Sequence, residues 1–398
     1  MRHVGFILLT VLLCLAAPGA PSASAAGDYG ISFLVPGASG YNHGPSYVTR
    51  LGSALLVGSP GEGTGAVDVY DLKSGARTLH LTPVASDYGV GFGVGVTASA
   101  RGFLVGDLEA NEAYEFKRRT AELLRTFRPP PDGLARWFGA ATADLGALIA
   151  IGDPAAVAEP FGAEPQGRVH LYDARDGALL QTLVDPVAKV QGTFGASVVR
   201  VAGGFAVGQP SGYYDPGSVY VYDRHGILVQ TLRAPAPARN DRFGAALAAA
   251  GWRLMVGAPG GGIFEAPVDG RVYVFERRGR QFVLTSSLEA PAELQAGFGV
   301  AVAIEGSRAV VGSGGGAALF AFGNGTPLAV LTGPVVDYDL YNDTYYQPWY
   351  GLGMSVALVG KTVVAASGGD DENSGALVAG FTRGAERPDA CDSQYLCP

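Results

Sequence analysis

The stretch that decides the fold is residues 194–232, FGASVVRVAGGFAVGQPSGYYDPGSVYVYDRHGILVQTL. It holds four short apolar runs, ASVVRV, FAVGQP, SVYVY and ILVQTL, in which valine, tyrosine and phenylalanine dominate. Three segments that contain glycine or proline separate the runs, at residues 203–204, 210–217 and 225–226. Such a pattern predicts a four-stranded antiparallel meander of about 40–50 residues, the size of one propeller blade. One blade cannot bury both faces of its sheet alone, so it needs neighbours of the same kind.

The same unit recurs along the chain at a nearly constant spacing. Each unit starts at a Phe-Gly pair or a weaker copy of it, and a glycine follows fourteen residues later in all units except the last, which has alanine. The unit starts are Gly44, Phe92, Phe138, Phe194, Phe243, Phe298 and Leu352. These starts lie 46–56 residues apart and define seven units. We therefore predict an all-β, seven-bladed β-propeller with four-stranded antiparallel blades.

Phe-Gly followed by Gly-Ala-Pro, here Gly257-Ala258-Pro259, is the signature of the FG-GAP repeat. Seven such repeats resemble the β-propeller head of integrin α chains and bacterial secreted FG-GAP proteins. The resemblance covers about residues 44–381 and implies a seven-bladed propeller. It does not select a function, because propellers host many unrelated activities.

A displaced apolar run precedes the first unit. The fourth runs of the first six units end in a proline, and ISFLVP at residues 31–36 is a further copy of that run. The last unit, conversely, contains only three apolar runs before a polar tail. We expect the N-terminal strand to complete the last blade, which closes the ring and removes its open strand edges.

Residues 1–26 predict a secretory leader, with Arg2 before an apolar run of about twelve residues and a small-residue cleavage site near Ala25. That run is too short to span a bilayer. We expect an exported protein, extracellular or periplasmic in a bacterium. The domain plan is then a leader at 1–26, a propeller at 27–384 and a polar tail at 385–398. Cys391 and Cys397 are expected to pair within the tail, the alternative being two free thiols.

The charge balance disfavours polyanionic partners. The chain has 28 Lys and Arg against 36 Asp and Glu, and removal of Arg2 with the leader leaves a net charge of −9. No basic stripe is visible in the sequence, which argues against nucleic acid or an anionic membrane as a partner, and no membrane insertion is expected. The expected partner is an extracellular protein or glycan.

The resemblance to integrins raises the question of calcium, which sits in an Asp-x-Asp-x-Asp-Gly loop between the first two strands of integrin-like repeats. The corresponding turns here, such as Gly203-Gly204 and Gly251-Trp252, offer no cluster of carboxylates. We therefore expect no such metal and no cofactor. The weak candidates for a different calcium site are Asp337 and Asp339, together with Asp371 and its neighbours Asp370 and Glu372 in the next long loop.

Long connections on a rigid scaffold are where binding is usually found. From Pro334 to Leu352 the link between units takes 18 residues, where the other links take seven to nine, and tyrosine, tryptophan and aspartate fill it. Tyrosine and tryptophan dominate binding hot spots, although the same aromatics could instead form the local core of their blade. The candidate ligand-binding residues are Tyr338, Tyr341, Tyr345, Tyr346 and Trp349 in this link, Tyr213, Tyr214 and Asp215 in a long loop of the fourth unit, and His43.

Three functions remain open from the sequence. The first is a non-enzymatic secreted or surface-associated module for adhesion or interaction, which binds through the long-loop face. The second is a lyase-like enzyme acting on polysaccharide, with His43 or a tyrosine as base and Arg136 or Arg242 as the carboxylate-neutralising group, although no catalytic spacing selects them. The third is a scaffold subunit of an extracellular assembly. Asn324 and Asn342 stand in Asn-x-Thr acceptor patterns and are candidate glycosylation sites in a eukaryotic source.

Overall fold

The computed structural model describes residues 29–36, 47–60, 65–83, 91–157, 166–187, 192–210, 215–260, 270–294, 297–323, 325–332, 352–367 and 377–384. Within these ranges the chain forms 28 β-strands and one short 3-10 helix, η1 (Ala292–Leu294). The expected leader at 1–26 and tail at 385–398 lie outside the described residues.

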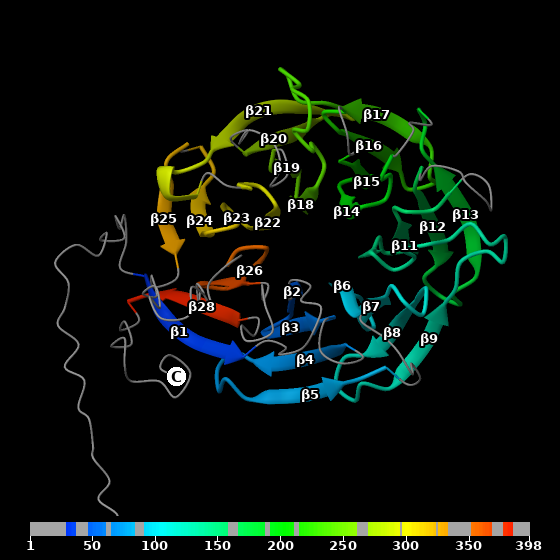
Figure 1. The fold of residues 1–398 in the computed structure, drawn as a ribbon, viewed down its shortest axis with the longest axis horizontal. Helices are drawn as coiled ribbons and strands as arrows, with labels where there is room; N and C mark the ends of the chain where they lie inside the picture. Colours follow the sequence, from blue (N-terminus) through cyan, green and yellow to red (C-terminus); the bar gives the residue numbers. More distant parts are fainter. Residues whose placement is uncertain are drawn as a thin grey trace, which may run out of the picture.

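The strands form seven four-stranded antiparallel sheets arranged as blades around a central axis (Figure 1). Blades 1 to 3 are, in order, β2 (Tyr47–Leu51), β3 (Ala54–Ser59), β4 (Ala66–Asp71) and β5 (Arg77–Leu81); β6 (Phe92–Ala98), β7 (Gly102–Asp107), β8 (Glu112–Lys117) and β9 (Leu123–Phe127); and β10 (Ala141–Asp144), β11 (Leu148–Asp153), β12 (Arg168–Asp173) and β13 (Leu179–Val184).

Blades 4 to 6 repeat this plan. They consist of β14 (Ser197–Val201), β15 (Gly204–Gln209), β16 (Ser218–Asp223) and β17 (Leu228–Leu232); β18 (Ala246–Ala250), β19 (Arg253–Ala258), β20 (Arg271–Arg278) and β21 (Gln281–Glu289); and β22 (Ala301–Glu305), β23 (Arg308–Ser313), β24 (Gly316–Ala321) and β25 (Pro327–Thr332). The all-β, seven-bladed fold predicted from the Phe-Gly spacing is confirmed.

Blade 7 is built from both ends of the chain. It contains β26 (Ser355–Val359), β27 (Thr362–Ala366), β28 (Leu377–Arg383) and, as its outermost strand, β1 (Tyr29–Pro36). Strands β1 and β28 run antiparallel, with Tyr29 opposite Arg383 and Pro36 opposite Leu377 (Figure 1). The predicted closure of the ring by the N-terminal strand is therefore confirmed.

The phenylalanine that opens each unit is a core residue. Phe138, Phe194, Phe243 and Phe298 are fully buried, and Leu352 takes the same buried position in blade 7. Each phenylalanine packs on aromatic residues of the third strand of its own blade; the Phe243 ring, for example, lies 5.5 Å from the Tyr273 ring. Burial of such a side chain contributes about 1.5–3 kcal/mol, so each repeat start fixes its blade to the core.

The glycine after each phenylalanine brings the backbones of two blades together. Gly244 of blade 5 has a φ of +96°, a value that glycine adopts far more readily than other residues. Its N–H donates to the carbonyl oxygen of Gly257 in its own blade over 2.9 Å. Its carbonyl oxygen accepts a hydrogen bond of 2.7 Å from Ser197 Oγ of blade 4 and lies against Gly208, where no Cβ would fit.

Six such glycine contacts run around the ring. In each, a methyl group on the second-strand glycine would lie closer than 3.0 Å to the carbonyl oxygen of the Phe-Gly glycine, or of Gly353, in the next blade. The pairs are Gly58 with Gly93, Gly106 with Gly139, Gly152 with Gly195, Gly208 with Gly244, Gly257 with Gly299, and Gly312 with Gly353. The fourteen-residue spacing in the sequence therefore records the contact between adjacent blades.

We expect Gly152→Ala to destabilise the ring by about 2–3 kcal/mol, because its Cβ would meet the rigid carbonyl of Gly195 and force the two blades apart. Gly325→Ala is the matched control, since nothing lies within 4 Å of a Cβ at that glycine and its φ is not positive. Urea denaturation measures both effects. Equal stability of the two variants would contradict the proposed role of the glycine contact.

Deletion of residues 28–36 should expose the edge of β28 and destabilise the protein by roughly several kcal/mol, because blade 7 loses a complete strand. Thermal unfolding and size-exclusion chromatography measure the loss. An unchanged melting temperature together with a monodisperse monomer would show that the ring does not need its N-terminal strand.

Candidate functional site

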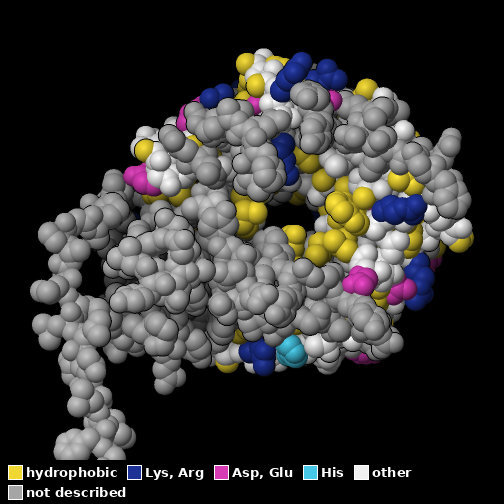
Figure 2. Space-filling view, in the orientation of Figure 1, with side chains coloured by type: hydrophobic (Ala, Val, Ile, Leu, Met, Phe, Trp, Pro, Cys, Tyr) yellow, Lys and Arg dark blue, Asp and Glu magenta, His cyan; other side chains and the backbone are white. Residues whose placement is uncertain are grey.

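A channel runs along the ring axis in the described part of the molecule. It has a volume of about 980 Å³ and is lined by the innermost strand of every blade, from β2 to β26. Figure 2 shows its opening at the centre of the ring, with hydrophobic side chains at its edge. The innermost strands are rich in alanine and valine, as expected for the crowded region near the axis, and this leaves room for the cavity.

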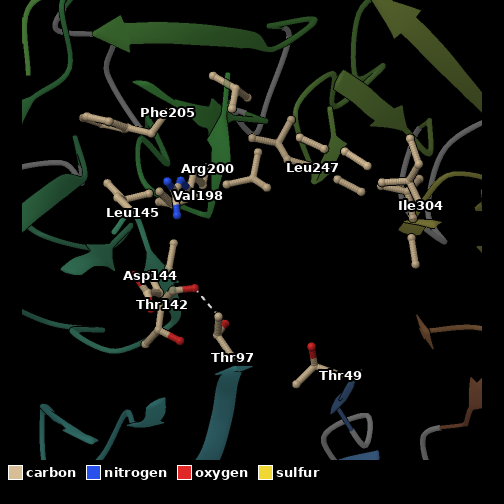
Figure 3. Close-up of a pocket in the computed structure, with 18 of the residues that line it drawn as sticks. Thr49, Thr97, Thr142, Asp144, Leu145, Val198, Arg200, Phe205, Leu247 and Ile304 are labelled. Atoms are coloured by element: carbon tan, nitrogen blue, oxygen red, sulfur yellow. Dashed lines mark hydrogen bonds between the residues drawn. The ribbon is translucent and has the colours of Figure 1, made fainter. Parts of the chain in front are cut away.

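The channel has two chemically different walls (Figure 3). Blades 1 to 3 contribute the hydroxyl side chains of Thr49, Thr97 and Thr142, whereas blades 4 to 6 contribute aliphatic side chains that include Leu247 and Ile304. Thr97 Oγ1 donates to the carbonyl oxygen of Thr142 over 2.8 Å, which joins blades 2 and 3. Such a wall can contact a polar group on one side and an apolar group on the other.

Charged residues surround one mouth of the channel, at the end where the first-to-second turns lie. Arg50 of blade 1 forms an ion pair with Glu305 of blade 6 and so reaches past the innermost strand of blade 7. Asp144 accepts hydrogen bonds from the backbone N–H groups of Ala100, at 2.6 Å, and Gly146, at 2.7 Å. At the mouth, the Arg50–Glu305 ion pair thus joins blades 1 and 6, and the Ala100–Asp144 hydrogen bond joins blades 2 and 3.

Arg200 is the fourth charged residue at this mouth. It is exposed, and within the described residues it forms no hydrogen bond or ion pair. Its guanidinium lies beside Gly146, at 3.3 Å from the position that a Cβ would take there (Figure 3). Arg200 is therefore a cation in the channel that is free to meet a ligand.

A second polar feature lies at the opposite end, where the second strands finish. The residue after the second-strand glycine, or after Ala366 in blade 7, is buried in all seven blades. It is polar in six of them: Ser59, Asp107, Asp153, Gln209, Ser313 and Ser367. Asp153 Oδ1 accepts hydrogen bonds from the N–H groups of Arg136, at 3.3 Å, and Trp137, at 2.9 Å. Gln209 Nε2 donates to Asp185 over 2.5 Å. These side chains fix the bases of the connections that leave this end.

His170 of blade 3 is buried beside the Phe138 ring, and its Nδ1 lies 3.0 Å from Thr182 Oγ1. Burial lowers the pKa of His170 to about 4, and the nearby Arg168 adds to the shift. Arg168 itself forms an ion pair of 2.7 Å with Asp132. A neutral, enclosed imidazole fits a structural role better than that of a general base working near neutral pH.

Most of the predicted ligand-binding residues lie outside the described residues. These are His43, Tyr213, Tyr214, Tyr338, Tyr341, Tyr345, Tyr346 and Trp349. The same holds for Asp337, Asp339 and Asp371, for Cys391 and Cys397, and for Asn324 and Asn342. Asp215 is described, and its Oδ1 accepts a hydrogen bond of 2.8 Å from Gly217 N, which closes a local turn.

No group of three or more His, Cys, Asp or Glu residues that could hold a metal ion occurs in the described ranges. Nor do these ranges contain a helix long and apolar enough to cross a membrane. The hairpin acids Asp71, Asp173 and Asp223 accept hydrogen bonds from backbone N–H groups of their own turns and therefore stabilise those turns.

Arg136 and Arg242, the two alternatives for the carboxylate-neutralising group of a lyase, lie in different links between blades. The Arg136 guanidinium donates to the carbonyl oxygens of Gly133 and Ala135, both at 3.0 Å, so it is held by its own link. Arg242 lies in the link that leads to blade 5, and blade 4 separates the two positions in the ring. The candidate bases, His43 and the tyrosines of the long loops, lie outside the described residues, so the pairing of a base with either arginine stays a hypothesis.

The charged residues of the channel mouth were missed in the sequence, although a signal exists. Arg50, Asp144 and Arg200 each stand six residues after the start of their unit. That position is the last or the second-to-last residue of the innermost strand. A residue there therefore lies at the same mouth of the channel in every blade. Alignment of the seven units by their starts would have shown it.

Comparison with known proteins supports the fold alone. No family model matches the chain, and no curated protein matches its sequence. The β-propeller domain of Cps50 (Swd1) from Myceliophteria thermophila is similar, with a TM-score of 0.59 and 12% identity over 88% of this chain and 99% of that one. Raptor from Chaetomium thermophilum matches with a TM-score of 0.56 and 12% identity over 91% of this chain, which spans 30% of Raptor. At 12% identity, these structural similarities show a shared fold and nothing about function.

The lowered pKa of His170 predicts a pH dependence of stability. The unfolded chain binds this proton near pH 6.5 and the folded chain only near pH 4, so unfolding becomes easier as the pH falls between these values. Denaturant titrations should show that the wild type loses up to about 3 kcal/mol more than His170→Phe across this range. Identical pH profiles of the two proteins would contradict the assignment.

Proposed function

We propose that this protein is a secreted or surface-associated FG-GAP-repeat propeller that binds an extracellular protein or glycan through its loop end and has no enzymatic activity. The loop end is the side of the ring at which the second strands finish and the first strands begin. The proposal combines the confirmed seven-bladed fold with the Phe-Gly and Gly-Ala-Pro signature at Gly257-Ala258-Pro259 and the leader-like residues 1–26.

The observation that carries this proposal is the unequal length of the connections. Between Thr332 at the end of β25 and Ser355 at the start of β26 the chain has 22 residues, whereas the other five links between successive blades have 10 to 13. First-to-second turns, in contrast, have only two or three residues. Because long connections tolerate variation and carry binding residues, the loop end is the favoured contact surface.

The described part of the loop end supplies an anchor of its own. Trp137 is 54% exposed, although its backbone N–H is held by Asp153. A large aromatic side chain on a fixed backbone binds with little loss of conformational entropy, which is typical of hot-spot residues. The buried polar residues at the ends of the second strands hold neighbouring connections in the same manner.

We expect Trp137→Ala to weaken capture of the partner by about 2 kcal/mol, and the triple change of Tyr345, Tyr346 and Trp349 to alanine to weaken it at least as much. The assay is a pull-down from the native surface or matrix, followed by titration of the captured partner. Leu284→Ala is the control, because Leu284 is exposed, at 36%, in the middle of the outermost strand β21 and lies at neither end of the ring.

Retained capture by both loop-end variants, with their stability unchanged, would place the contact elsewhere. A melting temperature lowered by the triple change would show instead that those aromatics form a local core. Turnover of a panel of polyuronates by the wild type would overturn the non-enzymatic proposal in favour of a lyase.

A further inference from the structure

The end of the ring opposite the loop end carries a large excess of positive charge. This turn end consists of the first-to-second and third-to-fourth turns together with the two strand residues on either side of each turn. In blade 7, whose third and fourth strands are not joined by a turn, it includes instead the last two residues of β28 and the first two of β1. It contains 17 of the 28 Lys and Arg in the chain but only seven of the 36 Asp and Glu. The basic residues are Arg50, Lys73, Arg77, Arg101, Lys117, Arg118, Arg119, Arg175, Arg200, Arg224, Arg253, Arg277, Arg278, Arg280, Arg308, Lys361 and Arg383.

The gathering of basic residues at the turn end changes the conclusion, drawn from the sequence, that the protein lacks a basic surface. No basic stripe is visible along the chain because each unit contributes only one to four of these residues. The propeller topology places every such turn at the same end, so cations that are far apart in sequence share one surface. An acidic protein thereby acquires a strongly basic face.

The turn end is also broad and nearly free of long loops. Strands in a sheet lie about 4.8 Å apart, so a ring of four-stranded blades is about 40 Å across. All seven blades contribute at least one of the cations, and the turns between their strands have at most five residues. Since one partner in a standard protein interface buries only about 800 Å², this disc fits an extended planar surface better than a compact protein.

Several of the cations are available for a ligand. Arg118, Arg119, Arg278 and Arg280 are exposed, and none of them forms a hydrogen bond or ion pair within the described ranges. Others have internal partners; Arg175, for instance, binds Asp173 over 2.8 Å. The free guanidinium groups suit phosphate oxygens, which they can bind in a bidentate manner.

Exposed apolar side chains occur in the same turns and adjoining strand ends as these cations. Eight of the 13 large hydrophobic residues that are exposed in the described part of the chain belong to the turn end, all of them in blades 2 to 5: Leu123, Leu124, Leu179, Leu180, Ile227, Leu228, Val229 and Trp252. Ile227 and Trp252 lie in the turns themselves and are 62% and 57% exposed. Apolar residues interleaved with cations are typical of surfaces that lie on a bilayer.

We propose that the turn end is a docking surface for a bilayer that carries anionic phospholipid, on which the protein lies peripherally. The arginines meet the phosphate groups, and Ile227 and Trp252 enter the headgroup region. A soluble polyanion would account for the cations but not for the apolar side chains that accompany them. In this arrangement the loop end faces away from the membrane and stays free to bind its partner.

The first test is sedimentation with vesicles of phosphatidylcholine alone and with vesicles that also contain phosphatidylglycerol. We expect binding only to the anionic vesicles at about 0.1 M salt, and release at about 1 M salt, where the Debye length falls from about 10 Å to about 3 Å. Absence of binding to the anionic vesicles at the lower salt concentration would overturn the proposal.

The second test removes charge from each end of the ring in turn. A basic residue near an anionic bilayer strengthens binding about fivefold, so changing Arg118, Arg119, Arg278 and Arg280 together to glutamine should weaken it about a hundredfold or more. The matched control changes Arg128, Arg233, Arg239 and Arg242 to glutamine, which removes the same charge from the loop end. Equal loss in both variants would overturn the assignment of the turn end.

The third test follows Trp252 directly. The chain has three tryptophans, so Trp137→Phe and Trp349→Phe leave Trp252 as the single reporter. Its fluorescence should shift to shorter wavelength with anionic vesicles, since indole prefers the headgroup region, and Ile227→Ser should weaken vesicle binding. An unshifted spectrum, or turn-end-dependent binding to soluble heparin or an acidic protein without vesicle binding, would overturn the lipid assignment.

Discussion

The ring depends on the approach of one peptide carbonyl to one glycine Cα at six of the seven boundaries between blades. At the boundary of blades 4 and 5, the carbonyl oxygen of Gly244 occupies the space in which a side chain at Gly208 would stand. This close contact recurs at six boundaries. A small change in the distance between adjacent blades would therefore add up around the closed ring. The buried phenylalanine beside each Phe-Gly glycine then holds the blade at the angle set by its backbone. Packing and backbone geometry thus support the same architecture, as expected for a sequence that specifies one fold.

The fold could be predicted because its determinants are periodic in the sequence. The Phe-Gly spacing marks the boundaries between blades, and the displaced run at residues 31–36 marks the closure. Arg50, Asp144 and Arg200 could not be located without aligning the units, because a charged residue at a strand end has no local signature. Nor could the basic turn end, since its charge exists only after the ring has brought turns from all seven units to one side.

The two ends of the ring differ because strand connections differ in their constraints. Tight turns demand glycine and turn-forming aspartates such as Asp71 and Asp223, which bind their own backbone. The other positions in these tight turns are exposed to solvent and tolerate long charged side chains. At the loop end, buried residues such as Asp153 and Gln209 instead hold the bases of longer connections. A short-turn surface with a fixed shape and a long-loop surface with variable sequence therefore arise from the same repeat.

The pairing of β1 with β28 has a consequence for how the chain reaches its fold. It joins the two ends of the chain, so this contact has nearly the largest sequence separation possible and must overcome the entropy of closing a very long loop. High contact order of this kind slows folding, and β28 exposes an unpaired edge until β1 arrives. During that interval the β1 of one molecule can pair with the β28 of another, which would produce a domain-swapped dimer. Closure by the N-terminal strand therefore makes the completed ring resistant to edge pairing, while the swapped pairing that competes with closure becomes more frequent as the protein concentration rises.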